Sequence, residues 1–381
     1  MNRFIVIGGG ILGVSTAYHL AKQNKEVLLV DRNDPGQATD AAAGIICPWL
    51  SQRRNKAWYT LAKNGAAYYP SLIKQLEQEG EYEVGYSQVG TICIRKEESK
   101  LDKLEKIAKD RRNDAPEIGE IKRLSSEETK ALFPLLDSDY SSLFVSGGAR
   151  VDGRAFRNAL LNASKKLGAI HIVGDAVLEY QKNKVKGIRV EGEFIPADSV
   201  IVTAGAWGKE LLLPLGLNFL VTFQKAQILH FGIKNKDTSH WPVVMPPSDQ
   251  YLLAYDNGRI IAGATHENDV EKEDLRVTAG GIQEVLNKAL AIAPALADSI
   301  ILETRVGFRP FTPGFLPVFG KAPHYQGLFV ANGLGSSGLT VGPYLGYQIS
   351  KMVLDLPLDI DPKLYNVHQA FGTPFPCNRN R

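Results

Sequence analysis

The chain opens with two apolar runs that flank one amphipathic stretch. Residues 4–7 read Phe-Ile-Val-Ile, and residues 26–30 are apolar after their first position. Such continuous runs are typical of strands buried on both faces of a parallel sheet. Between them, residues 11–23 place apolar side chains at helical spacing. This opening therefore predicts a strand–helix–strand unit.

The rest of the chain returns twice to buried strands and has strands of antiparallel character between these returns. Residues 199–203 and 328–331 are apolar runs like the first, and each leads into a glycine-containing turn. Helices are predicted at residues 57–79, 96–113, 152–168 and 278–291, and in a last segment that ends near Leu354. Shorter strands are predicted at residues 90–95, 171–173, 176–180, 184–190, 224–231, 251–254 and 259–263. The pattern indicates an α/β fold, α+β overall.

The turn after the first strand carries a dinucleotide-binding pattern. Gly8, Gly10 and Gly13 form a GxGxxG motif between strand and helix. The first glycine permits the tight turn, the second leaves room for a pyrophosphate, and the third lets the helix pack closely on the strand. Asp31, at the end of the next strand, can accept hydrogen bonds from an adenosine ribose. FAD, NAD and NADP all remain open here, since Arg32 could pair with a 2′-phosphate.

The distribution of these signals along the chain favours FAD. Nucleotide-binding signals occur at the N-terminus, in the middle and near the C-terminus, with two insertions of antiparallel character between them. A nicotinamide dehydrogenase usually has one continuous Rossmann unit, whereas repeated returns to the cofactor domain suit a longer cofactor such as FAD. We predict an FAD-binding domain of residues 1–46, 147–218 and 303–366, an inserted substrate-binding domain of residues 47–146 and 219–302, and a tail of residues 367–381.

Composition narrows the class of protein. The 381 residues carry 44 Lys+Arg against 41 Asp+Glu, and this net charge of +3 is too small to suggest a nucleic-acid or anionic-membrane partner. No apolar run is long enough to cross a bilayer, and the chain start lacks the pattern of a signal peptide. Cys47, Cys93 and Cys377 lie far apart, which argues against a disulfide framework or a structural zinc. We expect a cytoplasmic protein without a metal.

Further motifs follow in an order that resembles a known family. They are Val-Thr-Ala-Gly-Ala-Trp at 202–207, Tyr251 with Gly-Ala-Thr at 263–265, Arg309-Pro310 with Thr312-Pro313, and Gly-x-Gly-x-x-Gly-x-Thr at 333–340. Together with the opening motif, they resemble the D-amino acid oxidase family of FAD-dependent oxidoreductases, in particular glycine oxidase, sarcosine oxidase and D-amino acid dehydrogenase. The resemblance covers nearly the whole chain.

The resemblance implies noncovalent FAD and a small amino acid or N-substituted amino acid as substrate, of the glycine, sarcosine or D-amino acid type. Hydride transfer to flavin N5 would give an imine that hydrolyses. Arg309 would pair with the substrate carboxylate, and Tyr251 would make a second contact. The resemblance carries over these cofactor-binding residues: Gly8, Gly10, Ile11, Leu12, Gly13, Asp31, Arg32, Thr39, Ala43, Gly44, Val177, Ala204, Gly205, Trp207, Gly335, Ser336, Ser337, Gly338, Leu339 and Thr340.

Several alternatives stay open at this point. Arg305 lies on the same strand face as Arg309 and competes with it for the carboxylate. If Arg53 and Arg54 line the pocket, they favour a flavoenzyme that oxidises a 2-hydroxy acid or a polyol phosphate. A third alternative is a non-catalytic flavin subunit of an electron-transfer complex.

The exact substrate is likewise open. So are the electron acceptor, which is oxygen or another molecule, and whether the chain forms a homo-oligomer. Sarcosine oxidases have a lysine beside the flavin where this chain has Ile260 and Ile261. That difference predicts a slow reaction with oxygen. His266 and Cys47 are expected near the active site, as a satisfied polar residue and a small buried thiol rather than as functional groups.

Overall fold

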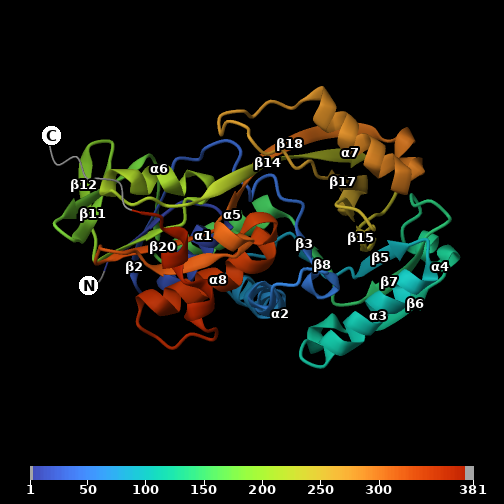
Figure 1. Cartoon of the computed structure of the whole chain (residues 1–381), viewed down its shortest axis with the longest axis horizontal. Coiled ribbons are helices and arrows are strands. Elements are labelled where there is room, and N and C mark those ends of the chain that lie inside the picture. The colour runs from blue at the N-terminus through green and yellow to red at the C-terminus, as the bar shows by residue number, and fades with distance from the viewer. Residues whose placement is uncertain (1–2, 374–381) are drawn as a thin grey trace.

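The computed structural model describes residues 3–373. Two large sheets lie toward opposite ends of its long axis, each with helices of its own (Figure 1). None of the helices in the described part of the chain has both the length and the apolar character that a membrane span requires.

The first sheet has six strands and contains both chain returns predicted from the sequence. Five of its strands are parallel, and only β19 runs antiparallel, to β20. In spatial order the strands are β19 (Val318–Lys321), β20 (Leu328–Asn332), β13 (Ser199–Val202), β1 (Arg3–Ile7), β2 (Glu26–Asp31) and β9 (Ile170–Val173).

Both faces of this sheet are covered, which explains why its central strands are mostly apolar. On β1, Phe4 and Val6 pack in one core with the helices, whereas Ile5 and Ile7 pack in a second core with a small antiparallel sheet. The helices are α1 (Ile11–Lys22), α2 (Lys56–Gln78), α5 (Gly153–Lys166) and α8 (Gly338–Val353), and the small sheet is β10 (Ala176–Gln181), β11 (Lys184–Val190) and β12 (Glu193–Pro196). The result is a three-layer α/β domain.

The second sheet has eight strands and is mostly antiparallel. One face packs on α7 (Ala279–Ile292), and the far end is flanked by α3 (Glu98–Arg112) and α4 (Ser126–Leu132). In spatial order the strands are β18 (Ile300–Phe311), β14 (Thr222–Gly232), β17 (Arg259–Gly263), β16 (Tyr251–Ala254), β15 (Val243–Met245), β5 (Thr91–Arg95), β7 (Ser141–Val145) and β6 (Ile121–Leu124).

The remaining regular elements connect the two sheets. A three-stranded sheet of β3 (Ile45–Ile46), β8 (Ala149–Val151) and β4 (Tyr86–Ser87) brings together the segments that cross between them. The short helix α6 (Gly208–Leu212) follows the middle return to the six-stranded sheet.

Two segments join a different sheet from the one that the predicted domain boundaries imply. Residues 303–311 were assigned to the FAD-binding domain, but they belong to β18 and pair with β14 in the eight-stranded sheet. Helix α2 was assigned to the substrate-binding domain, but it packs against α8 on the six-stranded sheet. The helix at residues 57–79 is predicted correctly, and long-range packing decides which sheet each of the two segments joins.

Candidate active site

A cavity of about 430 Å³ lies where the carboxyl ends of the parallel strands meet the eight-stranded sheet. Gly8 follows β1, Asp31 ends β2, and Ala204 follows β13, and all three line the cavity. From the eight-stranded sheet, Tyr251 and Arg309 line it too. In open α/β sheets, ligands bind at the carboxyl ends of the strands, so this cavity is the candidate site.

The GxGxxG turn has the geometry that a dinucleotide needs. Gly8 has a φ of +108°, and a Cβ at Gly13 would lie 1.8 Å from the Gly8 carbonyl oxygen. A Cβ at Gly10 would meet only the Thr39 hydroxyl, at 3.4 Å, and would otherwise point into open space. Gly13 is therefore required for helix–strand packing, whereas Gly10 keeps the cavity clear.

The acid at the end of β2 is fixed in place by its own neighbours. Asp31 Oδ1 accepts hydrogen bonds from the Asn33 amide (2.6 Å) and from Gln37 Nε2 (2.9 Å). Arg32 beside it is paired with Asp34 (2.8 Å) and reaches Asp175 (3.5 Å). Because two carboxylates engage the Arg32 guanidinium, this residue is poorly placed to recruit a 2′-phosphate. The geometry thus disfavours NADP.

The loop before α8 contributes the opposite end of the cavity. Gly338 and Thr340 belong to the first turn of α8 and line the cavity, so the positive end of the helix dipole faces it. The Thr340 hydroxyl donates to the Ile45 carbonyl (3.0 Å), and Trp58 Nε1 donates to Ser337 Oγ (3.0 Å). These contacts fix the loop against the β3 strand and against α2.

The predicted cofactor-binding residues come together with two exceptions. All of them line the cavity except Gly13, which packs α1 on β1, and Ser337, which is turned toward Trp58. The individual contacts of these residues with a cofactor stay predictions. Residues that line the cavity but were not predicted include Gly174, Ala226 and Gly307.

A sequence signal existed for one of these missed residues. Gly307 stands opposite Ala226 in the β14–β18 pair, and a Cβ on it would lie 2.6 Å from the Ala41 Cβ. A glycine inside a strand often marks a site where another backbone approaches closely. Ala226 and Gly174 carry no comparable signal.

The substrate end of the cavity holds one arginine without an acidic partner. Within the described chain no carboxylate forms an ion pair with Arg309, and its Nη1 lies 3.5 Å from Gln224 Oε1. Burial raises the pKa of Tyr251, and the charge and hydrogen bond of Arg309 act against this rise. Arg309 and Tyr251 therefore form an adjacent pair of donors in a mostly buried setting.

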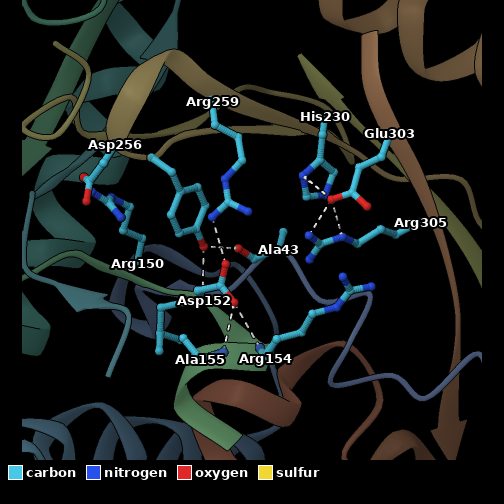
Figure 2. Close-up of polar contacts among 12 residues, drawn as sticks. Ala43, Arg150, Asp152, Arg154, Ala155, His230, Asp256, Arg259, Glu303 and Arg305 are labelled. Carbon is cyan, nitrogen blue, oxygen red and sulfur yellow. Dashed lines mark hydrogen bonds and ion pairs between the residues drawn. The ribbon is translucent and has the colours of Figure 1, made fainter. Parts of the chain in front are cut away.

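Arg305, the competing arginine, is already engaged. Its guanidinium pairs with Glu303 and donates to the Asp40 carbonyl at 3.3 Å. Figure 2 shows Arg305, Glu303 and His230 as one group. Arg305 thus ties β18 to the cavity-lining loop, and this position favours Arg309 for a ligand carboxylate.

A second ionic group supports the same loop from the side of α5. Asp152 accepts hydrogen bonds from the first amides of α5 and from Arg259 Nη2 at 2.8 Å (Figure 2). The Tyr255 hydroxyl donates to the carbonyl oxygens of Ala43 (2.8 Å) and Val151 (3.0 Å). These bonds position the loop around Ala43 from both sheets.

Other residues considered from the sequence lie outside the cavity lining. Ile260 and Ile261 are buried within β17 and do not line it, and no lysine among the described residues lines it either. The slow reaction with oxygen stays a prediction. Cys47 is a buried thiol, as expected, and burial raises its pKa to about 12. His266 also lies outside, although its pKa is lowered by burial and by the charge of Arg309. Cys377 lies outside the described residues.

Acidification should destabilise the fold through two buried histidines. Burial is the main cause that lowers the pKa of His19 to about 3 and of His230 to about 4, from 6.5. Between pH 6.5 and these values the unfolded chain binds more protons, so the free energy of unfolding falls as the pH falls. We expect a loss of about 2 kcal/mol per histidine between pH 7 and pH 5, measured by urea denaturation.

The matched substitutions are His19→Gln and His368→Gln. The first should make the pH dependence shallower, and the second, at an exposed position, should leave it unchanged. Equal slopes for wild type and His19→Gln would contradict the assignment.

Comparisons with known proteins agree with this geometry. A model of the DAO family, described as FAD-dependent oxidoreductases, matches residues 3–352. An uncharacterised oxidoreductase, YurR of Bacillus subtilis, is 60% identical over 96% of this chain and 98% of its own length. Glycine oxidase of Pseudomonas putida is 25% identical over 97% of this chain and 100% of its own length.

Solved structures give the same result. Iminodiacetate oxidase from Chelativorans sp. BNC1 superposes with a TM-score of 0.92 at 42% identity, and the match covers 96% of this chain and 98% of that one. Glycine oxidase from Geobacillus kaustophilus shares the fold, with a TM-score of 0.83 at 23% identity over 96% of this chain and 99% of that one. The chain belongs to the DAO family, and it is an FAD-dependent oxidoreductase.

Proposed function

We propose that this enzyme oxidises a small amino acid or N-substituted amino acid, of the glycine, sarcosine or D-amino acid type. The product is an imine, which water hydrolyses. The observation that carries the proposal is Arg309, a cavity-lining guanidinium without a carboxylate partner among the described residues. Since iminodiacetate oxidase is similar at 42% identity, an N-carboxymethyl amino acid is the first substrate to test.

The residues around the cavity fit FAD. Gly10 leaves open space beside the first turn of α1, Asp31 lies at the end of β2, and the first turn of α8 faces the opposite end. When bound, FAD supplies the acceptor for a hydride equivalent. The first turn of a helix stabilises negative charge placed beside that turn. The first turn of α8 would therefore suit the end of the flavin on which negative charge develops when it is reduced.

The protein side of the chemistry is binding and orientation. Arg309 can hold a substrate carboxylate through two parallel hydrogen bonds. Because burial raises the pKa of Tyr251, its hydroxyl stays protonated at neutral pH and can donate to the same carboxylate. Two fixed donors leave the substrate one orientation in the cavity, and such positioning lowers the barrier of the reaction.

A panel of substrates tests the proposal. Under anaerobic conditions the flavin absorbance should bleach with iminodiacetate, sarcosine, glycine or a D-amino acid. Bleaching only by 2-hydroxy acids or polyol phosphates would support the alternative flavoenzyme, and no bleaching by any of them would favour an electron-transfer subunit. The same reduced enzyme, exposed to oxygen or to a dye, identifies the electron acceptor.

We also expect the FAD to be noncovalent. Cys47 and Cys93 are buried, and neither lines the cavity, so no thiol in the described part of the chain is placed to attack the flavin. Acid precipitation should therefore release the yellow colour into the supernatant. Colour that stays with the pellet would contradict this prediction.

The expected partners and location of the protein are those inferred from the sequence. A small-molecule substrate and oxygen or another acceptor are the expected partners. A cytoplasmic location and a homo-oligomer stay predictions.

A further inference from the structure

A second cavity, of about 570 Å³, lies apart from the active site. The segment before α2, the start of α2, strand β5 and one face of α3 surround it. It shares no lining residue with the first cavity. Every charged residue that lines it is a cation, namely Arg53, Arg54, Lys56, Arg95, Lys100, Lys103 and Arg111.

Most of these cations lack an acidic partner. Among the described residues, only Lys100 forms an ion pair, with Glu97 at 2.6 Å. Arg111 Nη1 donates to the carbonyl oxygens of Trp49 (2.6 Å) and Ser51 (2.7 Å), so its position is fixed while its charge is not neutralised. The cavity therefore concentrates positive charge in a concave, partly desolvated space, which favours an anion.

Arg95 adds to the electrostatic cost of gathering these cations around the cavity. This arginine is 9% exposed, and its Nη1 donates only to the neighbouring Ile94 carbonyl, at 2.6 Å. A buried cation without a counter-ion is unfavourable unless it is paired. A bound anion would supply the missing pairing.

Tyr59, half-buried beside this cavity, has an unpartnered hydroxyl. The Tyr59 hydroxyl is inaccessible and has no hydrogen-bond partner in the described structure, and its residue lines this cavity. The Arg111 guanidinium lies over the same ring, 4.4 Å from its centre. Burial raises the pKa of Tyr59 to about 12, so the hydroxyl is a donor at neutral pH. Buried polar groups without partners are rare in native proteins.

We propose that this basic pocket binds a small multivalent oxyanion, either a phosphate ester or a polycarboxylate. Guanidinium and ammonium groups are the donors that proteins use for such ligands. Two or more negative charges are needed, because a single charge would leave most of the surrounding cations unbalanced.

The pocket is linked to the active site through Arg53. The Arg53 guanidinium stacks on Trp58 at 4.8 Å and contacts the Phe315 carbonyl. Trp58 in turn donates to Ser337 in the loop before α8. A ligand that holds residues 52–56 would therefore stabilise the same contacts that fix the flavin-side loop.

Calorimetric titration of the FAD-loaded protein tests the proposal. Inorganic phosphate and citrate are titrated separately, each against sodium chloride at matched ionic strength. At least one should bind saturably, and the stronger of the two identifies the ligand as phosphoryl or polycarboxylate. The double substitution Arg54→Gln with Lys103→Gln should weaken this binding by about tenfold or more, because two charge-assisted contacts are lost.

Two further variants separate this pocket from other effects. Lys106→Gln removes one positive charge from α3 at an exposed position outside the cavity lining, and it should leave binding unchanged. Arg309→Ala should also leave it unchanged, because Arg309 belongs to the other cavity. This result would hold even if the proposed substrate were wrong.

Three outcomes would overturn the proposal. They are the absence of binding beyond the chloride control, equal loss in the double variant and in Lys106→Gln, and loss in Arg309→Ala with retention in the double variant. Arg54 and Lys103 are exposed, so the double variant should keep its thermal midpoint without added anion.

Discussion

Replacing Arg309 by alanine should reduce kcat/KM for carboxylate substrates by a factor of about 30 to several thousand. Truncating one partner of a buried charge pair costs about 2–5 kcal/mol, and this cost translates into the stated range. Arg309 lines the cavity with Tyr251 beside it and has no acidic partner in the described chain. Its substitution therefore removes a ligand contact without freeing a buried carboxylate of the protein.

Whether the loss appears in KM or in kcat shows what the Arg309 contact does. An increase in KM alone would mean that Arg309 serves the bound substrate and the transition state equally, and a decrease in kcat as well would mean that it also orients the reacting carbon. Arg309→Lys keeps the charge but loses the planar pair of donors, so we expect it to restore only part of the activity.

FAD content and the flavin spectrum should stay normal in both variants. The matched control is Arg276→Ala, which removes an arginine whose side chain is 83% exposed and paired with Asp274, and it should retain full activity. Near-normal kcat/KM in Arg309→Ala would contradict the role of this residue. The carboxylate contact would then pass to Arg305, because Arg53 and Arg54 line the other cavity.

Gly10→Ala and Gly13→Ala should fail in different ways. A methyl group at Gly13 would lie 1.8 Å from the Gly8 carbonyl oxygen, so α1 must move away from β1. We expect a loss of stability of about 3 kcal/mol or more, at or above the usual cost of overpacking. A methyl group at Gly10 meets only the Thr39 hydroxyl, at 3.4 Å, and Gly10 has a φ of −70° that alanine adopts freely. The fold should therefore tolerate it.

FAD binding should nevertheless be weakened in Gly10→Ala, because the second glycine of this motif lets the backbone approach the pyrophosphate. We expect flavin affinity to fall at least about tenfold, which corresponds to about 1.4 kcal/mol. The measurements are the flavin-to-protein ratio after purification and the thermal midpoint of the flavin-free protein. A Gly10→Ala protein that retains FAD as tightly as wild type would contradict this account of the turn.

Much of the cofactor half of the site could be predicted from the sequence, because its determinants are local. The GxGxxG turn joins one strand to the next helix, and Asp31 ends the following strand. Strand and helix periodicity, tight turns and the end of a strand are all properties of neighbouring residues. Asp152 likewise caps α5, as its position before the apolar pattern predicts.

The substrate half depended on the tertiary structure. Arg305 and Arg309 occupy the same face of β18 and are equivalent in the sequence pattern, but Glu303 and the loop at Asp40 engage only Arg305. Membership of residues 303–311 in the eight-stranded sheet follows from pairing with β14, far away in the chain.

By itself, the sequence determined the two returns to a parallel sheet, the dinucleotide turn and the two candidate arginines. Tertiary structure decided which arginine is left without an acidic partner among the described residues, that Ile260 and Ile261 are not part of the cavity lining, and that cations from α2, α3 and β5 enclose a second cavity. The physical reason is that charge pairing and cavities depend on side chains from distant segments, whereas turns and strand burial are set within a few residues.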